Sequence, residues 1–261
     1  SYSTGDEYTG EFNGSGGERC GVGECTFSNG TRYTGQWLDD AQHGDGQSKA
    51  ADGAEYKGQW AAGVKCGKGV CSYCVPASSK YDGEWGGDCR EGQGKHTRQD
   101  GSVYEGEWGA DDMAGEGTVT MANGDVYSGS WSGSKLTGTV AYKNGDAFEG
   151  QCVDQKRFGS GELRCADGEA YSGDWKNDYR EGAGKVTYPS GEVYDGGWVR
   201  DERSGNGMAH ESPAAASPSS SSSLLGGSVY NGNWLHGKRE KYGTCKFADG
   251  SEYMGEWKED L

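Results

Sequence analysis

Apolar and polar positions alternate along this chain in short segments, which is the pattern of β-strands rather than of helices. In residues 104–108 (YEGEW) the tyrosine, glycine and tryptophan fall on one side of an extended strand, and the two glutamates fall on the other. The next segment places Gly117, Val119 and Met121 on one side. Each such pair of segments predicts two short strands with one aromatic, apolar face and one polar face.

The paired segments recur along the chain with a period of about 23 residues. Their first anchor position holds Tyr8, Tyr33, Tyr56, Tyr81, Tyr104, Tyr127, Phe148, Tyr171, Tyr194, Tyr230 and Tyr253. The position four residues later holds all nine tryptophans, Trp37, Trp60, Trp85, Trp108, Trp131, Trp175, Trp198, Trp234 and Trp257. Phe12 and Cys152 occupy that position in the other two units.

Glycines recur at fixed positions of the repeat. One lies between the tyrosine and the tryptophan, where the missing Cβ leaves a slot for an aromatic ring from the neighbouring strand. These structural glycines are Gly35, Gly58, Gly83, Gly106, Gly129, Gly150, Gly173, Gly196, Gly232 and Gly255. A Gly-x-Gly pair follows most of the tryptophans, and an Asn-Gly or Asp-Gly dipeptide such as Asn29-Gly30 usually precedes the next tyrosine. We expect these dipeptides to form type I′ hairpin turns, in which both central residues have positive φ.

Tandem hairpins predict an all-β fold, an elongated single-sheet solenoid of stacked antiparallel hairpins. With two strands per unit, eleven units form a twisted rod of about 100 Å. We expect one continuous array over residues 1–261, with ten complete repeats and a partial eleventh. Residues 211–227 are rich in Ser, Pro and Ala and predict a flexible insertion loop between repeats 9 and 10, with phosphorylation as a further possibility.

One stretch departs from the repeat. The unit between Tyr127 and Phe148 is shortened to 21 residues, Leu136 stands where the first glycine of the pair belongs, and Cys152 replaces a tryptophan. Two interpretations stay open: a local bend or seat for a partner, or simple decay of the repeat.

Composition agrees with an aromatic core. The chain has 50 glycines and no isoleucine, and its 41 acidic and 25 basic residues give a net charge of −16. Few aliphatic residues and a high net charge are typical of disordered chains, but disordered chains are also poor in aromatic residues. The negative charge argues against nucleic acid as the main partner.

Apolar runs are short, and we expect a chain without integral membrane contact that resides in the cytoplasm, with its nine cysteines reduced. Cys25, Cys71 and Cys245 occupy a position held elsewhere by valine or leucine, which predicts small apolar core residues. The alternative is a zinc site formed by Cys66, Cys71, Cys74 and Cys89, which strand alternation disfavours. We expect neither a metal nor a cofactor.

The unit formed by residues 104–108, Gly115-Glu116-Gly117 and Asn123-Gly124 resembles the MORN (membrane occupation and recognition nexus) repeat, and the resemblance covers essentially the whole chain. It implies a solenoid of hairpins and non-enzymatic roles. Repeats of this family occur in junctophilins, in radial spoke head proteins of cilia, in cytoskeletal scaffolds of protozoan parasites and as accessory segments of some enzymes.

No catalytic constellation is apparent, and acidic pairs in the turns after tryptophan, such as Asp39-Asp40, are expected to be solvated. We therefore expect no enzyme but a structural scaffold or spacer that binds other proteins, as an extended peptide or an amphipathic helix along an aromatic groove. The resemblance suggests a cytoskeletal or ciliary, axonemal setting. The candidate partner-binding residues are Tyr104, Trp108, Tyr127, Trp131, Phe148, Cys152, Tyr171, Trp175, Tyr194 and Trp198.

Two alternatives and one assembly hypothesis accompany this interpretation. The first alternative is peripheral binding to anionic phospholipid, for which the basic residues are Lys238, Arg239, Lys241 and Lys246. The second is a targeting arm of a larger enzyme. The incomplete final repeat leaves an open sheet end that predicts a homodimer or a larger assembly.

Overall fold

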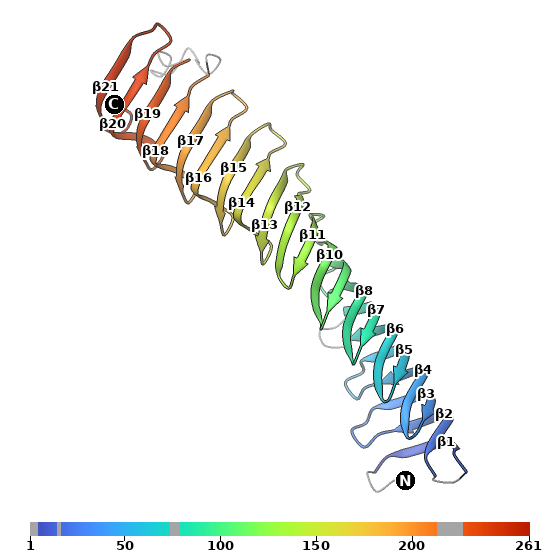
Figure 1. Ribbon diagram of the computed structural model, residues 1–261. Coiled ribbons are helices and arrows are strands. Elements are labelled where there is room, and N and C mark those ends of the chain that lie inside the picture. Colours follow the sequence, from blue (N-terminus) through green and yellow to red (C-terminus); the bar gives the residue numbers. More distant parts are fainter. Residues whose placement is uncertain (1–4, 15–16, 74–78, 213–226) are drawn as a thin grey trace. The chain divides into compact units, whose positions relative to one another are not determined.

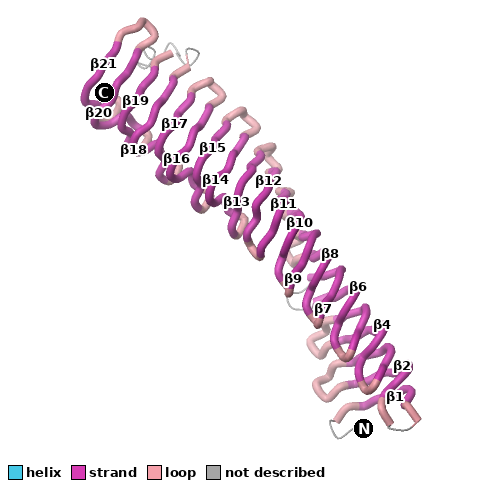
Figure 2. Tube along the Cα trace, in the orientation of Figure 1, coloured by secondary structure: helices cyan, strands magenta, loops and turns pink. Residues whose placement is uncertain are grey.

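The computed structural model describes residues 5–14, 17–73, 79–212 and 227–261. The chain divides into two compact units, Ser1–Gly133 and Ser134–Leu261. All regular structure among the described residues is β-strand, and Figure 2 shows the strands joined by short loops. The all-β prediction is confirmed, and no helix able to cross a membrane is found in the described ranges.

The described residues of the first unit form eleven strands, each paired antiparallel with its neighbours in sequence (Figure 1). They are β1 (Glu7–Phe12), β2 (Arg19–Thr26), β3 (Arg32–Leu38), β4 (Ala41–Lys49), β5 (Glu55–Ala61), β6 (Val64–Tyr73), β7 (Ser79–Gly86), β8 (Cys89–Thr97), β9 (Val103–Gly109), β10 (Asp112–Thr120) and β11 (Val126–Ser132).

In the second unit, the parts that the structure describes form ten strands with the same neighbour-to-neighbour pairing. They are β12 (Lys135–Ala141), β13 (Ala147–Val153), β14 (Lys156–Arg164), β15 (Ala170–Lys176), β16 (Tyr179–Thr187), β17 (Val193–Val199), β18 (Glu202–His210), β19 (Val229–Leu235), β20 (Lys238–Lys246) and β21 (Glu252–Trp257). Stacked antiparallel hairpins are therefore the architecture of both units, as the repeat predicts.

The turn chemistry differs from our expectation. Asn29 does not have positive φ; in that turn only Gly30 does, and the Gly30 N–H donates to the Phe27 carbonyl at 2.9 Å. This is a three-residue loop with a glycine bulge rather than a type I′ turn. The prediction of type I′ turns at the Asn-Gly and Asp-Gly dipeptides is therefore wrong, because a single left-handed residue suffices to close this longer loop.

Consecutive residues with positive φ lie at the opposite end of the strands, directly after the tryptophans. Asp39 and Asp40 have φ of 49° and 63°, and Asn177 and Asp178 have 51° and 72°. Two such residues in succession are the signature of the type I′ turn. These turns connect the strands within a repeat, whereas the glycine loops connect one repeat to the next.

Each Gly-x-Gly pair forms a bulge. In β3 and β4, Gly35 pairs with Gly46 while the next residue, Gln36, pairs with His43. The two skipped residues begin with Gly44, whose φ is 60°. A left-handed residue at a bulge favours glycine, so the first glycine of the pair is required by the backbone.

The tyrosine ring of a repeat lies flat over two facing glycines. Tyr33 covers Gly35 on its own strand and Gly46 across the hairpin. A Cβ on Gly35 would lie 2.5 Å from the Gly46 Cα and 2.6 Å from the Tyr33 Oη, closer than atoms can pack. A ring does lie against Gly35, but it belongs to Tyr33 of the same strand and not to the neighbouring strand as predicted. The tyrosine hydroxyl donates to the Gln36 carbonyl at 2.9 Å.

The two substituted positions of the shortened repeat face each other in the structure. Leu136 in β12 pairs with Cys152 in β13, where other repeats pair a glycine with a tryptophan, and both side chains are buried.

Within the predicted insertion, residues 213–226 lie outside the described residues. At its base the Glu211 N–H donates to the Ser228 carbonyl at 2.9 Å, which continues the hairpin pairing.

Candidate partner-binding surface

The ten residues predicted to bind a partner lie in the core of the sheet face that carries the rings. Their exposed fractions range from 0 to 6%: Tyr104 0%, Trp108 4%, Tyr127 6%, Trp131 6%, Phe148 2%, Cys152 1%, Tyr171 1%, Trp175 4%, Tyr194 0% and Trp198 2%. A partner could not touch these rings without displacing the side chains that cover them. Partner binding by these residues stays a prediction, and their burial argues for a structural role.

Neighbouring rings meet edge to face within and between repeats. The Tyr171 ring centroid lies 4.9 Å from that of Trp175 in its own repeat and 5.5 Å from that of Trp198 in the next. The interplanar angles are 81° and 88°, the T-shaped geometry that aromatic rings favour. Eight of the nine tryptophans also donate their indole N–H to a glycine carbonyl of the preceding repeat, as Trp198 does to Gly184 at 3.0 Å, whereas the Trp60 indole has no partner among the described residues. These contacts tie each repeat to its neighbour.

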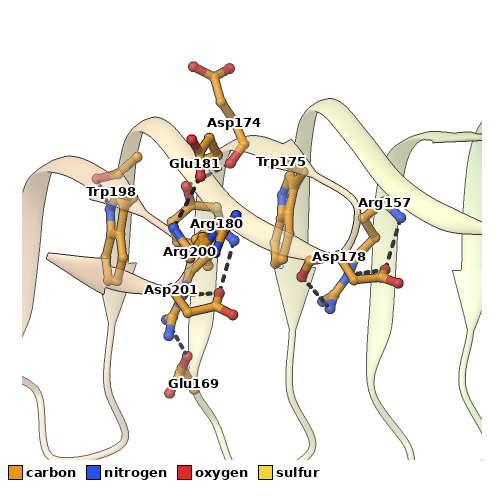
Figure 3. A network of polar contacts seen from close by, with 12 residues as sticks. Arg157, Glu169, Asp174, Trp175, Asp178, Arg180, Glu181, Trp198, Arg200 and Asp201 are labelled. Atoms are coloured by element: carbon orange, nitrogen blue, oxygen red, sulfur yellow. Dashed lines mark hydrogen bonds and ion pairs between the residues drawn. The ribbon is translucent and has the colours of Figure 1, made fainter. Parts of the chain in front are cut away.

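Arginines cover six of the nine tryptophans, a feature that the sequence analysis missed. In Figure 3 the Arg157 guanidinium stacks on Trp175 and that of Arg180 stacks on Trp198, with 4.1 and 4.4 Å from Cζ to the ring centroid. Such cation–π contacts favour a guanidinium over an indole face. The arginines of this ladder are Arg19, Arg90, Arg157, Arg180, Arg203 and Arg239, and the side chains of all six are 9 to 19% exposed.

Aspartates from the following type I′ turn hold five of these arginines. Asp178 Oδ1 accepts from the Arg157 backbone N–H at 2.9 Å and from its Nε at 3.2 Å, while the Asp178 carbonyl accepts from Nη2. The other such pairs are Arg19–Asp40, Arg90–Asp111, Arg180–Asp201 and Arg239–Asp260. The expectation that Asp40 is merely solvated charge is wrong, because its carboxylate orders the arginine of the preceding repeat.

The position of these arginines within the repeat is the sequence signal from which the arginine–aspartate pairs could have been predicted. All six lie two residues before the first position of the Gly-x-Gly pair, and their aspartates follow about 21 residues later, three residues after a tryptophan. The regular spacing could have indicated a structural pair between repeats.

Burial, hydrogen bonds and neighbouring charges shift the pKa values of several side chains. Burial raises the pKa of Tyr33 and of Tyr104 to about 12. Burial opposes ionisation of Asp111 as well, but hydrogen bonds from the Arg90 backbone and guanidinium outweigh it and lower the pKa of that carboxyl. Burial, with Arg90 and Arg98 nearby, lowers the pKa of His96 to about 4.

The basic residues considered for lipid binding do not form a free cluster. The Arg239 guanidinium stacks on Trp257 at 4.5 Å and bonds to Asp260, and the residue is buried. Lys238 pairs with Glu259 at 3.5 Å. Arg239 therefore belongs to the core and offers no surface charge to a membrane.

The cysteines divide as the repeat predicts. Cys25, Cys71 and Cys245 are buried and take the place of valine in the core, which confirms that prediction. Cys66 and Cys89 are half-buried, and Cys74 lies outside the described residues. Among the residues that the structure describes, no three His, Cys, Asp or Glu side chains gather as a metal site would require.

The polar face of the first unit carries an open groove of about 660 Å³ that crosses β3 to β7. Gly46, Gly58 and Gly69 line it, the first two half-buried and Gly69 buried, so the floor of the groove is backbone recessed between rows of longer side chains. The remaining lining residues are Thr34, Asp45, Gln47, Lys57, Lys68, Val70 and Asp82. Ligand sites favour concave surfaces with a few polar groups, and this groove is the candidate partner-binding surface.

A side-chain hydrogen bond holds each bulge beside the groove. The Gln36 Oε1 accepts from the Asp45 N–H at 3.3 Å, and the Gln59 Oε1 accepts from the Lys68 N–H at 3.0 Å. Both amides therefore fix the backbone on which the groove residues stand.

Comparison with solved structures finds similar single domains at low identity. The TCP10 domain of Danio rerio CPAP in complex with a peptide of Danio rerio STIL is 11% identical, with a TM-score of 0.47, over 95% of this chain and 98% of that one. The SAS-4 (dCPAP) TCP domain in complex with a proline-rich motif of Ana2 (dSTIL) of Drosophila melanogaster is 12% identical, with a TM-score of 0.29, over 74% of this chain and 90% of that one. These values support no inference about function.

No curated protein matches the chain. The MORN repeat family does, in eight segments: residues 8–32, 33–55, 56–74, 81–103, 104–126, 171–193, 194–209 and 230–252. The matched segments contain the hairpins, facing glycines and stacked rings described above. The chain therefore belongs to the MORN repeat family.

Proposed function

We propose that this chain is a non-enzymatic scaffold or spacer that binds other proteins. The observation that carries the proposal is the open groove over Gly46, Gly58 and Gly69, which runs across five strands of the polar face. A repeat sheet holds such a surface rigidly because each hairpin is fixed by its neighbours. The MORN family is a non-enzymatic repeat family, which supports this function.

The finer features of the proposal come from the repeat and the family. We infer ten complete repeats and a partial eleventh in one continuous array, since β13 and β14, outside the matched segments, pair in the register of β15 and β16. A cytoplasmic location within a cytoskeletal or ciliary assembly is proposed from family association alone. A targeting arm of a larger enzyme is the alternative, which a catalytic domain in the complete gene product would favour.

Affinity purification from the native cell, read by mass spectrometry and followed by calorimetry with the purified partner, tests the proposal. Gln47→Trp places a large ring on the groove wall without changing charge and should weaken binding at least tenfold. Thr139→Trp, at the equivalent exposed position of the second unit, is the matched control. If no protein is captured specifically, or if Gln47→Trp binds like the control, the groove is not the partner surface.

A further inference from the structure

Two lysines stand on opposite sides of one glycine pair in the groove. Gly58 in β5 faces Gly69 in β6; Lys57 precedes Gly58 and pairs with Val70, and Lys68 precedes Gly69. Because the strands are antiparallel, the two lysines lie diagonally across the glycines, one on each side. Both are exposed and both line the groove.

These lysines differ in their ion pairing from Lys49, Lys80 and Lys95 of the same unit. Lys49 pairs with Glu55 at 2.6 Å, Lys80 with Asp82 at 3.8 Å and Lys95 with Glu105 at 3.3 Å. Across the described ranges, neither Lys57 nor Lys68 has an ion pair. The centre of the groove therefore holds two lysines without an ion pair on a chain of net charge −16, with Glu84 of β7 opposite Lys68 in the strand register.

The two acids of the groove lie toward its ends. Asp45 belongs to β4 and Asp82 to β7, outside the strands that carry the lysines. The Lys80 Nζ lies 3.8 Å from the Asp82 carboxylate. Charge complementarity thus favours a ligand whose negative groups lie at the centre of the groove.

We propose that the groove binds an extended acidic segment of a partner protein, with carboxylates held between Lys57 and Lys68. This inference rests on the proposed scaffold function and names the chemistry of its partner. A peptide reaches the recessed glycine backbone, whereas the flat surface of a bilayer does not. At ordinary salt the screening length is about 8 Å, so distant acids repel such a segment only weakly.

Fluorescence anisotropy with labelled hexaglutamate, hexaglutamine and hexalysine peptides tests the proposal on the whole chain. Hexaglutamate should bind at least tenfold more tightly than hexaglutamine. Lys57→Gln/Lys68→Gln should weaken hexaglutamate binding at least tenfold. Lys176→Gln/Lys185→Gln makes the same change in net charge at exposed positions of the second unit and should leave binding unchanged.

Equal losses in the two double variants, or no preference for hexaglutamate, would overturn the proposal. A second measurement, flotation with phosphoinositide vesicles, tests whether a lipid supplies the negative charge instead. Flotation that depends on Lys57 and Lys68 would also overturn the proposal. Partner capture that survives the Lys57→Gln/Lys68→Gln change would refute the acidic segment but leave the scaffold function standing. A chain that captures no protein at all would refute the scaffold function itself.

Discussion

Leu136 lies directly opposite Cys152 across the β12–β13 pair, and both side chains are buried. In the regular hairpins this pair of positions holds a glycine and a tryptophan, as in Gly159 and Trp175. The leucine supplies volume where the tryptophan is lost, so two departures from the repeat compensate each other. This relationship favours decay of the repeat with compensation over a partner seat.

Compensation predicts coupled effects on stability. Leu136→Gly should destabilise the fold by about 2–5 kcal/mol, as loss of a buried leucine does, and Cys152→Trp should overpack the site at a cost of about 1–3 kcal/mol. The double variant restores a glycine opposite a tryptophan and should cost less than the sum by at least about 1 kcal/mol. Urea unfolding of the four proteins measures this, and simple additivity would refute the compensation.

Lys241 is a second departure from the repeat, because it occupies the glycine position at a bulge with φ of 57°. A left-handed conformation strains a residue with a Cβ, so Lys241→Gly should stabilise the fold by about 0.5–1 kcal/mol despite the added chain entropy. Lys246→Gly, in the regular part of β20, should destabilise it instead. A higher denaturation midpoint for the first variant and a lower one for the second would bear this out; a destabilised Lys241→Gly protein would contradict it.

The arginine ladder predicts that Arg180 stabilises the second unit. Arg180→Ala removes the stack on Trp198 and the bonds to Glu169 and Asp201, and should cost about 1–3 kcal/mol. Arg180→Lys keeps the charge but loses the planar stack, so its stability should be intermediate. Arg200→Ala alters a turn position that alanine fills in other repeats and should stay within about 0.5 kcal/mol of the wild type by denaturant unfolding. Equal effects of Arg180→Ala and Arg200→Ala would argue against the ladder.

His96 predicts an acid-sensitive component of stability. Its Nε2 lies 2.8 Å from the Ser79 Oγ, and burial beside Arg90 and Arg98 lowers its pKa to about 4 from an ordinary value of 6.5. Between these two pH values the unfolded chain binds the proton that the folded chain does not, so stability falls as pH drops from about 6.5 to about 4. Below about 4 this contribution no longer changes.

The control is His96→Val, since valine occupies the same repeat position at Val119 and Val186. The wild type should lose more stability than this variant when denaturation midpoints at pH 7 and pH 4.5 are compared. Parallel losses in the two proteins would show that His96 titrates without linkage to folding.

Burial of Arg239 predicts weak binding to anionic membranes. With Arg239 in the core and Lys238 paired to Glu259, flotation with phosphoinositide vesicles at about 150 mM salt should recover little protein. Lys238→Glu/Lys246→Glu tests the exposed basic residues without removing the buried guanidinium. Strong flotation abolished by this double change would establish the lipid alternative instead.

The hairpin architecture could be read from the sequence because its information is local. Alternation around Tyr104 and Trp108 assigns the two faces, and a bare glycine between them is needed wherever a ring lies against backbone. Each strand pairs with the next in sequence, so a period of about 23 residues suffices to predict the pairing. The aromatic core followed from the same pattern.

Three features were decided by the tertiary structure. Burial of Trp198 depends on Arg180 of the preceding repeat, and a strand pattern shows which face a ring occupies but not what covers it. The left-handed turn residues lie after tryptophan because two-residue turns there must match the strand twist. The groove beside Lys57 and Lys68 arises where bulged strands stack and backbone is left open between side chains, a property of several repeats together that no single repeat encodes.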